Sequence, residues 1–134
     1  MITDKIRRFI EEVDVAFVAS ADAEGTPHLA AGMGLQVTDP DHLAFEAWFC
    51  TKTLDNVAHH PRLAIAVTAP KTGKGYQFIG TVEKSSETAI LDGFVPGLES
   101  PGLPQVCSRL EVRVETIMEF SARIHSDTPL AAGG

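Results

Sequence analysis

Apolar residues between positions 3 and 13 recur at the i, i+3, i+4 and i+7 spacing that places them on one face of a helix. Thr3 or Asp4 stands just before this stripe, and either side chain can cap a helix by accepting a backbone N–H bond. The pattern therefore predicts a short amphipathic helix over residues 3–13.

From residue 14 the pattern changes to short apolar, β-branched runs that are separated by turns containing Gly, Pro or Asp, which is typical of β-strands. The first two runs flank the turn "DAEGTP" and predict a hairpin. The last run alternates an apolar face with a charged face, and Ile117 stands on the charged face. The six predicted strands lie in "DVAFVASA", "HLAAGMGLQV", "HLAFEAWF", "RLAIAVTA", "YQFIGTVEKS" and the stretch from Leu110 to Phe120.

Three segments depart from the strand pattern. Apolar residues from Leu54 onward recur at helical spacing and predict about two helical turns, which Pro61 ends. Residues 86–94 predict a further short helix, whereas residues 95–105 hold several prolines and glycines and predict an irregular loop. Residues 126–134 predict a frayed tail.

The order of these elements predicts the fold class. Strands follow one another without regular helical crossovers, so antiparallel pairing is expected, and six such strands close most easily into a small barrel. We therefore predict a mainly β, single domain over residues 1–134, with one N-terminal helix and one short helix between the third and fourth strands.

Composition and charge narrow the function. The chain has 134 residues, of which 44% are apolar and 22% charged, as in soluble globular proteins. A net charge of −7 argues against nucleic acid as a partner, because phosphates are repelled. Two cysteines are too few for a disulfide scaffold. No apolar run has the length of a membrane span and no signal-peptide pattern occurs, so we expect a cytoplasmic protein that does not bind membranes.

The stretch "FCTKTLDNVAHHPR", residues 49–62, holds the strongest candidate chemistry. A helix N-terminus binds anions, and Thr51, Lys52 and Thr53 would add two hydroxyls and a charge to a phosphate site. The alternative is that Thr53 merely caps the helix. A metal site at Cys50, His59 and His60 is disfavoured, because adjacent helical histidines point about 100° apart. We expect no metal.

The order of motifs from "LAFEAWFCTKTLDNVAHHPRLAIAV" to "GYQFIGTVE" resembles the FMN-binding split-barrel family, the pyridoxamine 5′-phosphate oxidase-like proteins. The matching features are Lys52 beside Thr53, the helix ending in "HHPR", the apolar strand after it, and Gly80 followed by Glu83. The resemblance extends over about residues 1–85 and is closest in layout to the small FMN-binding proteins. It implies a six-stranded antiparallel split β-barrel of the Greek-key type.

The resemblance also implies a cofactor site. FMN would lie at a homodimer interface, with its phosphate on Thr51, Lys52 and Thr53. The backbone of Ala31, Gly32 and Met33 would follow the flavin ring, and Phe49, Cys50 and Gln77 would lie near it. One departure is that Ala30 and Ala31 stand where oxidase members often carry a phosphate-binding Arg.

The function implied is that of an FMN-dependent oxidoreductase or electron-transfer protein, whose donor or acceptor is a small molecule or another protein. The residues predict no catalytic acid or base, and hydride or electron transfer by a flavin requires none. Two alternatives keep the same barrel: one binds F420 or haem instead of FMN, and the other is a cofactor-free dimeric interaction module.

Overall fold

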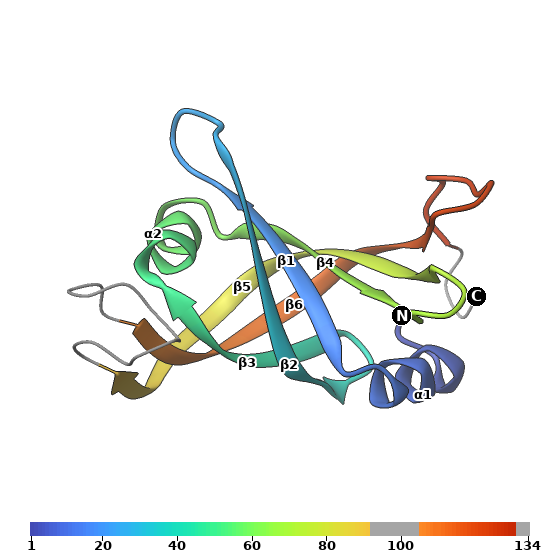
Figure 1. Ribbon diagram of the computed structural model, residues 1–134, viewed down its shortest axis with the longest axis horizontal. Coiled ribbons are helices and arrows are strands. Elements are labelled where there is room, and N and C mark those ends of the chain that lie inside the picture. The colour runs from blue at the N-terminus through green and yellow to red at the C-terminus, as the bar shows by residue number, and fades with distance from the viewer. Residues whose placement is uncertain (92–104, 131–134) are drawn as a thin grey trace.

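The computed structural model describes residues 1–91 and 105–130, and Figure 1 shows its course. Within these two ranges all six predicted strands are present, together with two helices. The elements are α1 (Asp4–Glu12), β1 (Val15–Ala21), β2 (Pro27–Asp39), β3 (His42–Cys50), α2 (Thr51–His59), β4 (Arg62–Thr68), β5 (Lys74–Leu91) and β6 (Gln105–Ser121).

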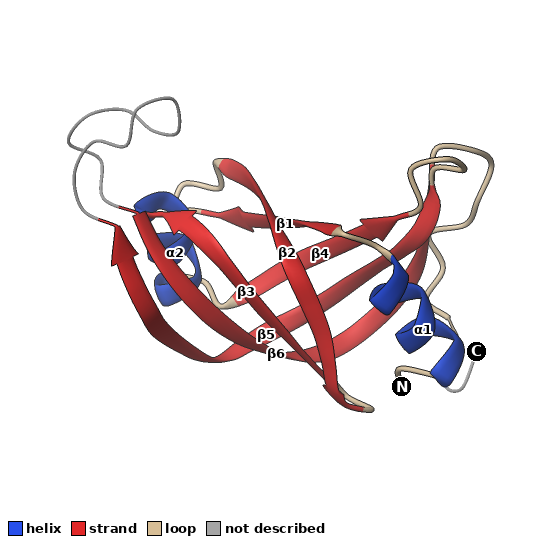
Figure 2. Cartoon of the chain, turned by 60° about the horizontal axis from the view of Figure 1, so that its bottom comes forward, coloured by secondary structure: helices blue, strands red, loops and turns tan. Residues whose placement is uncertain are grey.

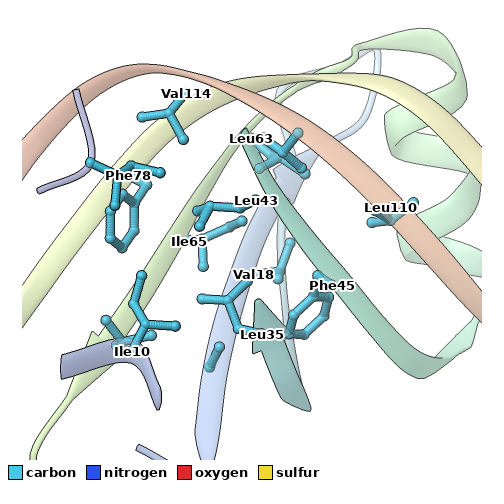
Figure 3. Close-up of a cluster of buried hydrophobic side chains, with 14 of the residues drawn as sticks. Ile10, Val18, Leu35, Leu43, Phe45, Leu63, Ile65, Phe78, Leu110 and Val114 are labelled. Carbon is cyan, nitrogen blue, oxygen red and sulfur yellow. The ribbon is translucent and has the colours of Figure 1, made fainter. Parts of the chain in front are cut away.

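The strands form one closed antiparallel barrel in the order β1-β2-β3-β6-β5-β4, which confirms the predicted fold class. Inward-facing residues from every strand form a single core, part of which Figure 3 shows. Phe45 and Phe78 are the largest fully buried side chains in it.

The two helices lie at opposite ends of the barrel (Figure 2). The α1 helix begins as predicted, since the side chain of Thr3 accepts a hydrogen bond from the backbone N–H of Ile6 at 3.3 Å. Its apolar stripe closes one end through Ile6 and Ile10, which are each 1% exposed. The α2 helix packs against β1, β2 and β3 at the other end. No helix in the described part of the chain is long and apolar enough to cross a membrane.

Although the barrel is closed, β2 and β3 pair with each other along only part of their length. In the described residues β2 pairs with β3 from Met33↔Glu46 to Asp39↔His42, with a register shift on either side of Gln36 and Val37. Residues 27–32 of β2 pair with β1 alone, and residues 47–50 of β3 pair with β6. We call this region, where β2 residues 27–32 and β3 residues 47–50 are not paired with each other, the split. It lies at the α2 end of the barrel.

The predicted faces of the last strand are correct up to Val114 and wrong beyond it. The ladder between β5 and β6 shifts register between Ile79 and Gly80, and Glu115 is left as the extra residue of a bulge. The alternation therefore reverses, so that Ile117 is buried at 3% exposure and Phe120 is exposed at 39%. Ile117 belongs to the core rather than to the charged face.

The prediction of a helix over residues 86–94 is also wrong for residues 86–91, which the structure describes. β5 continues as a strand to Leu91 and pairs with β6 along this length, so pairing with a neighbour overrides local helix propensity. Residues 92–94 and the predicted loop up to residue 104 lie outside the described residues.

The segment after β6 turns back onto the barrel. The backbone N–H of Leu130 donates to the carbonyl of Ile117 at 2.8 Å, and the Leu130 side chain packs against the core. Residues 126–130 are therefore attached to the barrel at Leu130, although the sequence predicts fraying from residue 126. The rest of the predicted tail, residues 131–134, is outside the described part.

Candidate functional site

The first turn of α2 is the natural place for an anion. Strand β3 leads directly into this helix, so the N–H groups of its first turn have no acceptor within the helix and carry its partial positive charge. Thr51 and Lys52 are exposed there. We call the α2 N-terminus, with Thr51 and Lys52, the anion site.

Lys52 already has an ionic partner. Its Nζ lies 3.1 Å from Oδ2 of Asp22, in the turn between β1 and β2. The other carboxylate oxygen, Oδ1, accepts the backbone N–H groups of Glu24 and Thr26, each at 2.9 Å. The bond from Thr26, followed by the one from Lys52, lowers the pKa of Asp22 below its ordinary value. The site therefore contains a fixed negative charge beside its lysine.

Thr53 lies on the inner side of the same helix. Its side chain is 0% exposed, and its hydroxyl has no hydrogen-bond partner among the described residues. One turn later Asn56 is 2% exposed and donates to the hydroxyl of Ser20 at 3.1 Å. The structure thus separates the predicted phosphate residues: Thr51 and Lys52 face outward, while Thr53 belongs to a buried polar layer under α2.

The predicted ring-binding residues of β2 lie at or beside the split. Ala31 and Met33 face outward, and Met33 is 64% exposed. Gly32 faces the other way, because a Cβ on it would overlap Cζ of Phe45 and lie 2.6 Å from Cβ of Ala47. Glycine is therefore required at position 32 by the core, and the outer side of the strand is free for a flat ligand.

Phe49 and Cys50 end β3 on the opposite side of the split, where they pair with Val106 and Gln105 of β6. Trp48 immediately before them is 49% exposed and faces outward. The structure thus brings two β2 positions, the end of β3 and the anion site to one end of the barrel.

Gln77 lies farther around the barrel. The register places Ala31 opposite Phe17, Phe17 opposite Ala66, and Ala66 opposite Gln77. Three strand spacings of about 4.8 Å make this roughly 14 Å along the surface. Gln77 is therefore not beside the split of its own chain.

Gln77 lines a shallow hollow of about 300 Å³ on the outer surface, whose other lining residues are almost all apolar. The hollow continues into an apolar outer face of the barrel. The large exposed residues of this face are Phe17, Leu29 and Phe120, which line the hollow, and Val15 and Met33, which are paired on β1 and β2.

Two features of the site could not be recognised from the sequence pattern. Asp22 looks like an ordinary turn residue, and its closeness to Lys52 depends on how the hairpin folds over α2. In the sequence, Trp48 is one of several apolar residues of a strand, and its exposure becomes clear only when the inward and outward faces of β3 are known. One signal was available: residues two apart in a strand share a face, so the charged Glu46 indicates that Trp48 also faces outward.

The described residues contain no group of three or more His, Cys, Asp or Glu that could hold a metal ion. His59 bonds through Nδ1 to the carbonyl of Asp55 at 2.9 Å.

Known structures share this fold. HupZ of Group A Streptococcus superposes with a TM-score of 0.65 at 19% identity, covering 94% of this chain and 99% of that one. An FMN-binding protein of Syntrophomonas wolfei gives a TM-score of 0.62 at 13% identity, with coverage of 92% and 88%. An F420 reductase gives 0.60 at 18% identity, with coverage of 87% and 98%. At these identities the likeness establishes the fold.

Sequence comparison gives the family. An uncharacterised protein of Methanocaldococcus jannaschii is 30% identical over 88 residues, which are 64% of this chain and 58% of that protein. The chain therefore matches little more than half the length of this relative. The family model described as pyridoxamine 5′-phosphate oxidase matches residues 2–117. Because this match covers most of the 134-residue chain, the chain belongs to the pyridoxamine 5′-phosphate oxidase family.

Proposed function

We propose that the protein binds FMN, with the phosphate at the anion site and the isoalloxazine ring along the split. The observation that carries the proposal is the arrangement at the α2 end of the barrel. There an exposed lysine at a helix N-terminus lies next to the half of β2 that β3 leaves unpaired. Family membership gives this arrangement its expected ligand.

The residues present fit such a ligand. First-turn N–H groups, the hydroxyl of Thr51 and the ammonium of Lys52 are donors suited to a phosphate. The outward backbone at Ala31 and Met33 offers a flat surface with small or flexible side chains. Bound FMN would supply hydride or single-electron transfer, while these residues would hold the ring, orient it and exclude water.

The protein would act as a flavin-dependent oxidoreductase or electron carrier. Its electron donor or acceptor would be a small molecule or a second protein that reaches the exposed edge of the ring. Single-electron exchange by a bound flavin would not require a side chain near the split to transfer a proton.

We further propose that two copies of the chain share the site. The outer apolar face defined above includes Leu29 at 66% and Met33 at 64% exposure, and apolar patches of this kind are usually covered by a partner. Gln77 supports the same arrangement, because it lies about 14 Å around the barrel from Ala31. It would reach the flavin of the other copy more easily than its own.

The absorbance spectrum of the purified protein tests the cofactor. Flavin gives two visible bands and haem gives a Soret band, so the bands identify what is bound. Titration of cofactor-free protein with FMN, FAD and riboflavin then tests the phosphate site. We expect FMN to bind more tightly than riboflavin, and equal affinities would contradict a phosphate site.

F420 is the second candidate, because a similar solved structure is an F420 reductase. F420 also carries a phosphate group, so the anion site alone does not separate the two. Competition between FMN and F420 for the same protein, followed by the fluorescence of Trp48, the single tryptophan, would rank them.

A further inference from the structure

We infer that Asp22 is a resident counter-ion of the anion site, and that it lowers the affinity of this site for phosphate and so determines how strongly FMN is preferred over riboflavin. The inference rests on the proposed phosphate site and adds the residue that limits its strength. It begins from the ion pair between Asp22 and Lys52, whose charged atoms are 3.1 Å apart.

The carboxylate is the fixed member of this pair. Oδ1 of Asp22 accepts two backbone N–H groups, and the backbone N–H of Asp22 itself donates to the carbonyl of Thr26 at 3.1 Å. A further bond from the N–H of Gly25 to the carbonyl of Asp22, at 3.0 Å, closes the turn. These bonds hold the carboxylate in one position within the turn, so Asp22 moves only together with the hairpin tip.

Lys52 is the adjustable member. Its side chain is 47% exposed, against 25% for Asp22, and its long aliphatic stem has many rotamers. A phosphate that arrives at the α2 N-terminus therefore shares Lys52 with a carboxylate that stays in place. The phosphate gains the ammonium and at the same time lies close to a negative charge.

This geometry has a direct consequence for selectivity. A phosphate on the far side of Lys52 would lie about 6 Å from the Asp22 carboxylate, where repulsion between like charges is still appreciable near a protein surface. Riboflavin carries no phosphate and would not experience this repulsion. Asp22 should therefore weaken FMN binding and leave riboflavin binding unchanged.

The decisive variant is Asp22→Asn. The amide oxygen of Asn can still accept the two turn N–H groups, so the turn is preserved while the charge is removed. We expect FMN to bind about 3- to 30-fold more tightly, from the Coulomb energy at this separation. The gain should shrink at high salt, because the charges involved are partly exposed. The affinity for riboflavin should stay the same.

Two controls separate this effect from others. Glu111→Gln removes one negative charge from another carboxylate–lysine pair, that of Lys84 and Glu111 at 4.0 Å, and should not change FMN binding. Asp22→Ser is a second neutral variant whose hydroxyl can accept a turn N–H. Thermal unfolding checks that each variant is folded.

Isothermal titration of the wild type, Asp22→Asn, Lys52→Ala and the double variant gives the outcome. Tighter FMN binding in Asp22→Asn, also in the Lys52→Ala background, supports the inference. Weaker or unchanged FMN binding in Asp22→Asn would overturn it, because Asp22 would then position Lys52 or be irrelevant. Equal affinities for FMN and riboflavin in every variant would show that no phosphate site exists. This outcome would refute both the proposed FMN site and the proposed role of Asp22.

Discussion

Nε2 of His42 lies 2.7 Å from a carboxylate oxygen of Glu83, and this contact joins the start of β3 to a bulge in β5. The other ring nitrogen lies 2.8 Å from Oδ1 of Asp39. The second oxygen of Glu83 accepts a bond from Nε of Arg113 at 3.2 Å. One imidazole thus connects two carboxylates at the α1 end of the barrel, far from the split.

The first prediction is that stability depends on the charge of His42. The hydrogen bond to Asp39, followed by that to Glu83, raises the pKa of His42 above its ordinary value of 6.5. The folded state therefore holds this proton more tightly than the unfolded chain. The stabilisation is complete below about pH 6.5 and is lost as the pH rises through the raised pKa.

Denaturant unfolding between pH 6 and pH 9 measures this effect. We expect the free energy of unfolding to fall with pH across this window in the wild type. In His42→Gln, which cannot be protonated, the same part of the slope should disappear. An identical slope in both proteins would show that His42 does not contribute.

The second prediction concerns the cation of the anion site. Lys52→Ala removes a charge-assisted bond to phosphate, which is worth roughly 1.5–3 kcal/mol. FMN should therefore bind about 10- to 150-fold more weakly, whereas riboflavin should bind as before. Titration calorimetry with both ligands provides the comparison.

Lys84→Ala is the matched control, because Lys84 also pairs with a surface carboxylate but belongs to no proposed site. It should leave both affinities unchanged. A parallel loss of FMN and riboflavin binding in Lys52→Ala would indicate damage to the fold instead of loss of a phosphate contact.

The third prediction concerns the outer apolar face. Phe17 faces outward from β1 at 40% exposure, and Phe17→Glu would place a charge in the proposed dimer interface. Burying that charge without a partner should weaken the dimer by about 10-fold or more. FMN binding should weaken in parallel if two copies share the site.

Sedimentation at low protein concentration, with and without FMN, measures both effects. Thr38→Glu is the control, since Thr38 is exposed beside the polar hollow lined by Asp39, His42 and Glu83. Wild-type protein that stays monomeric while saturated with FMN would contradict the shared site.

The fourth prediction tests the tight packing behind β2. A methyl group on Gly32 would overlap the ring of Phe45, which is 0% exposed and cannot move aside freely. Gly32→Ala should lower the free energy of unfolding by about 1–3 kcal/mol, as expected for overpacking. Adding Phe45→Leu should recover part of this loss, because the smaller side chain makes room. Additive losses in the double variant would place the strain elsewhere.

Local sequence patterns were sufficient for most of the fold. Thr3 and the apolar stripe after it identify α1, and the turn "DAEGTP" between two apolar runs identifies the hairpin of β1 and β2. These features depend on neighbours within a few residues, where propensity and periodicity are informative. The barrel followed from the strand order alone.

The errors arose where pairing between distant segments decides the outcome. The bulge at Glu115 exists because β5 and β6 change register there, and no pattern within β6 reveals that shift. For the same reason Ile117 was placed on the wrong face. At the candidate site, residues 51–53 were found from their own helix signal, whereas Asp22 becomes their neighbour only through the folded hairpin.

The partial pairing of β2 with β3 also divides one strand into two parts with different freedom to change. Residues 33–39 cannot shift without disturbing the β3 ladder and the α1 end of the core. Residues 27–32 are tied by strand pairing to β1 alone, so they can tilt outward or inward together with the hairpin tip. The width of the split can therefore vary only through residues 27–32 and the hairpin tip. Mutations there can reshape the α2 end of the barrel while the α1 end keeps its packing.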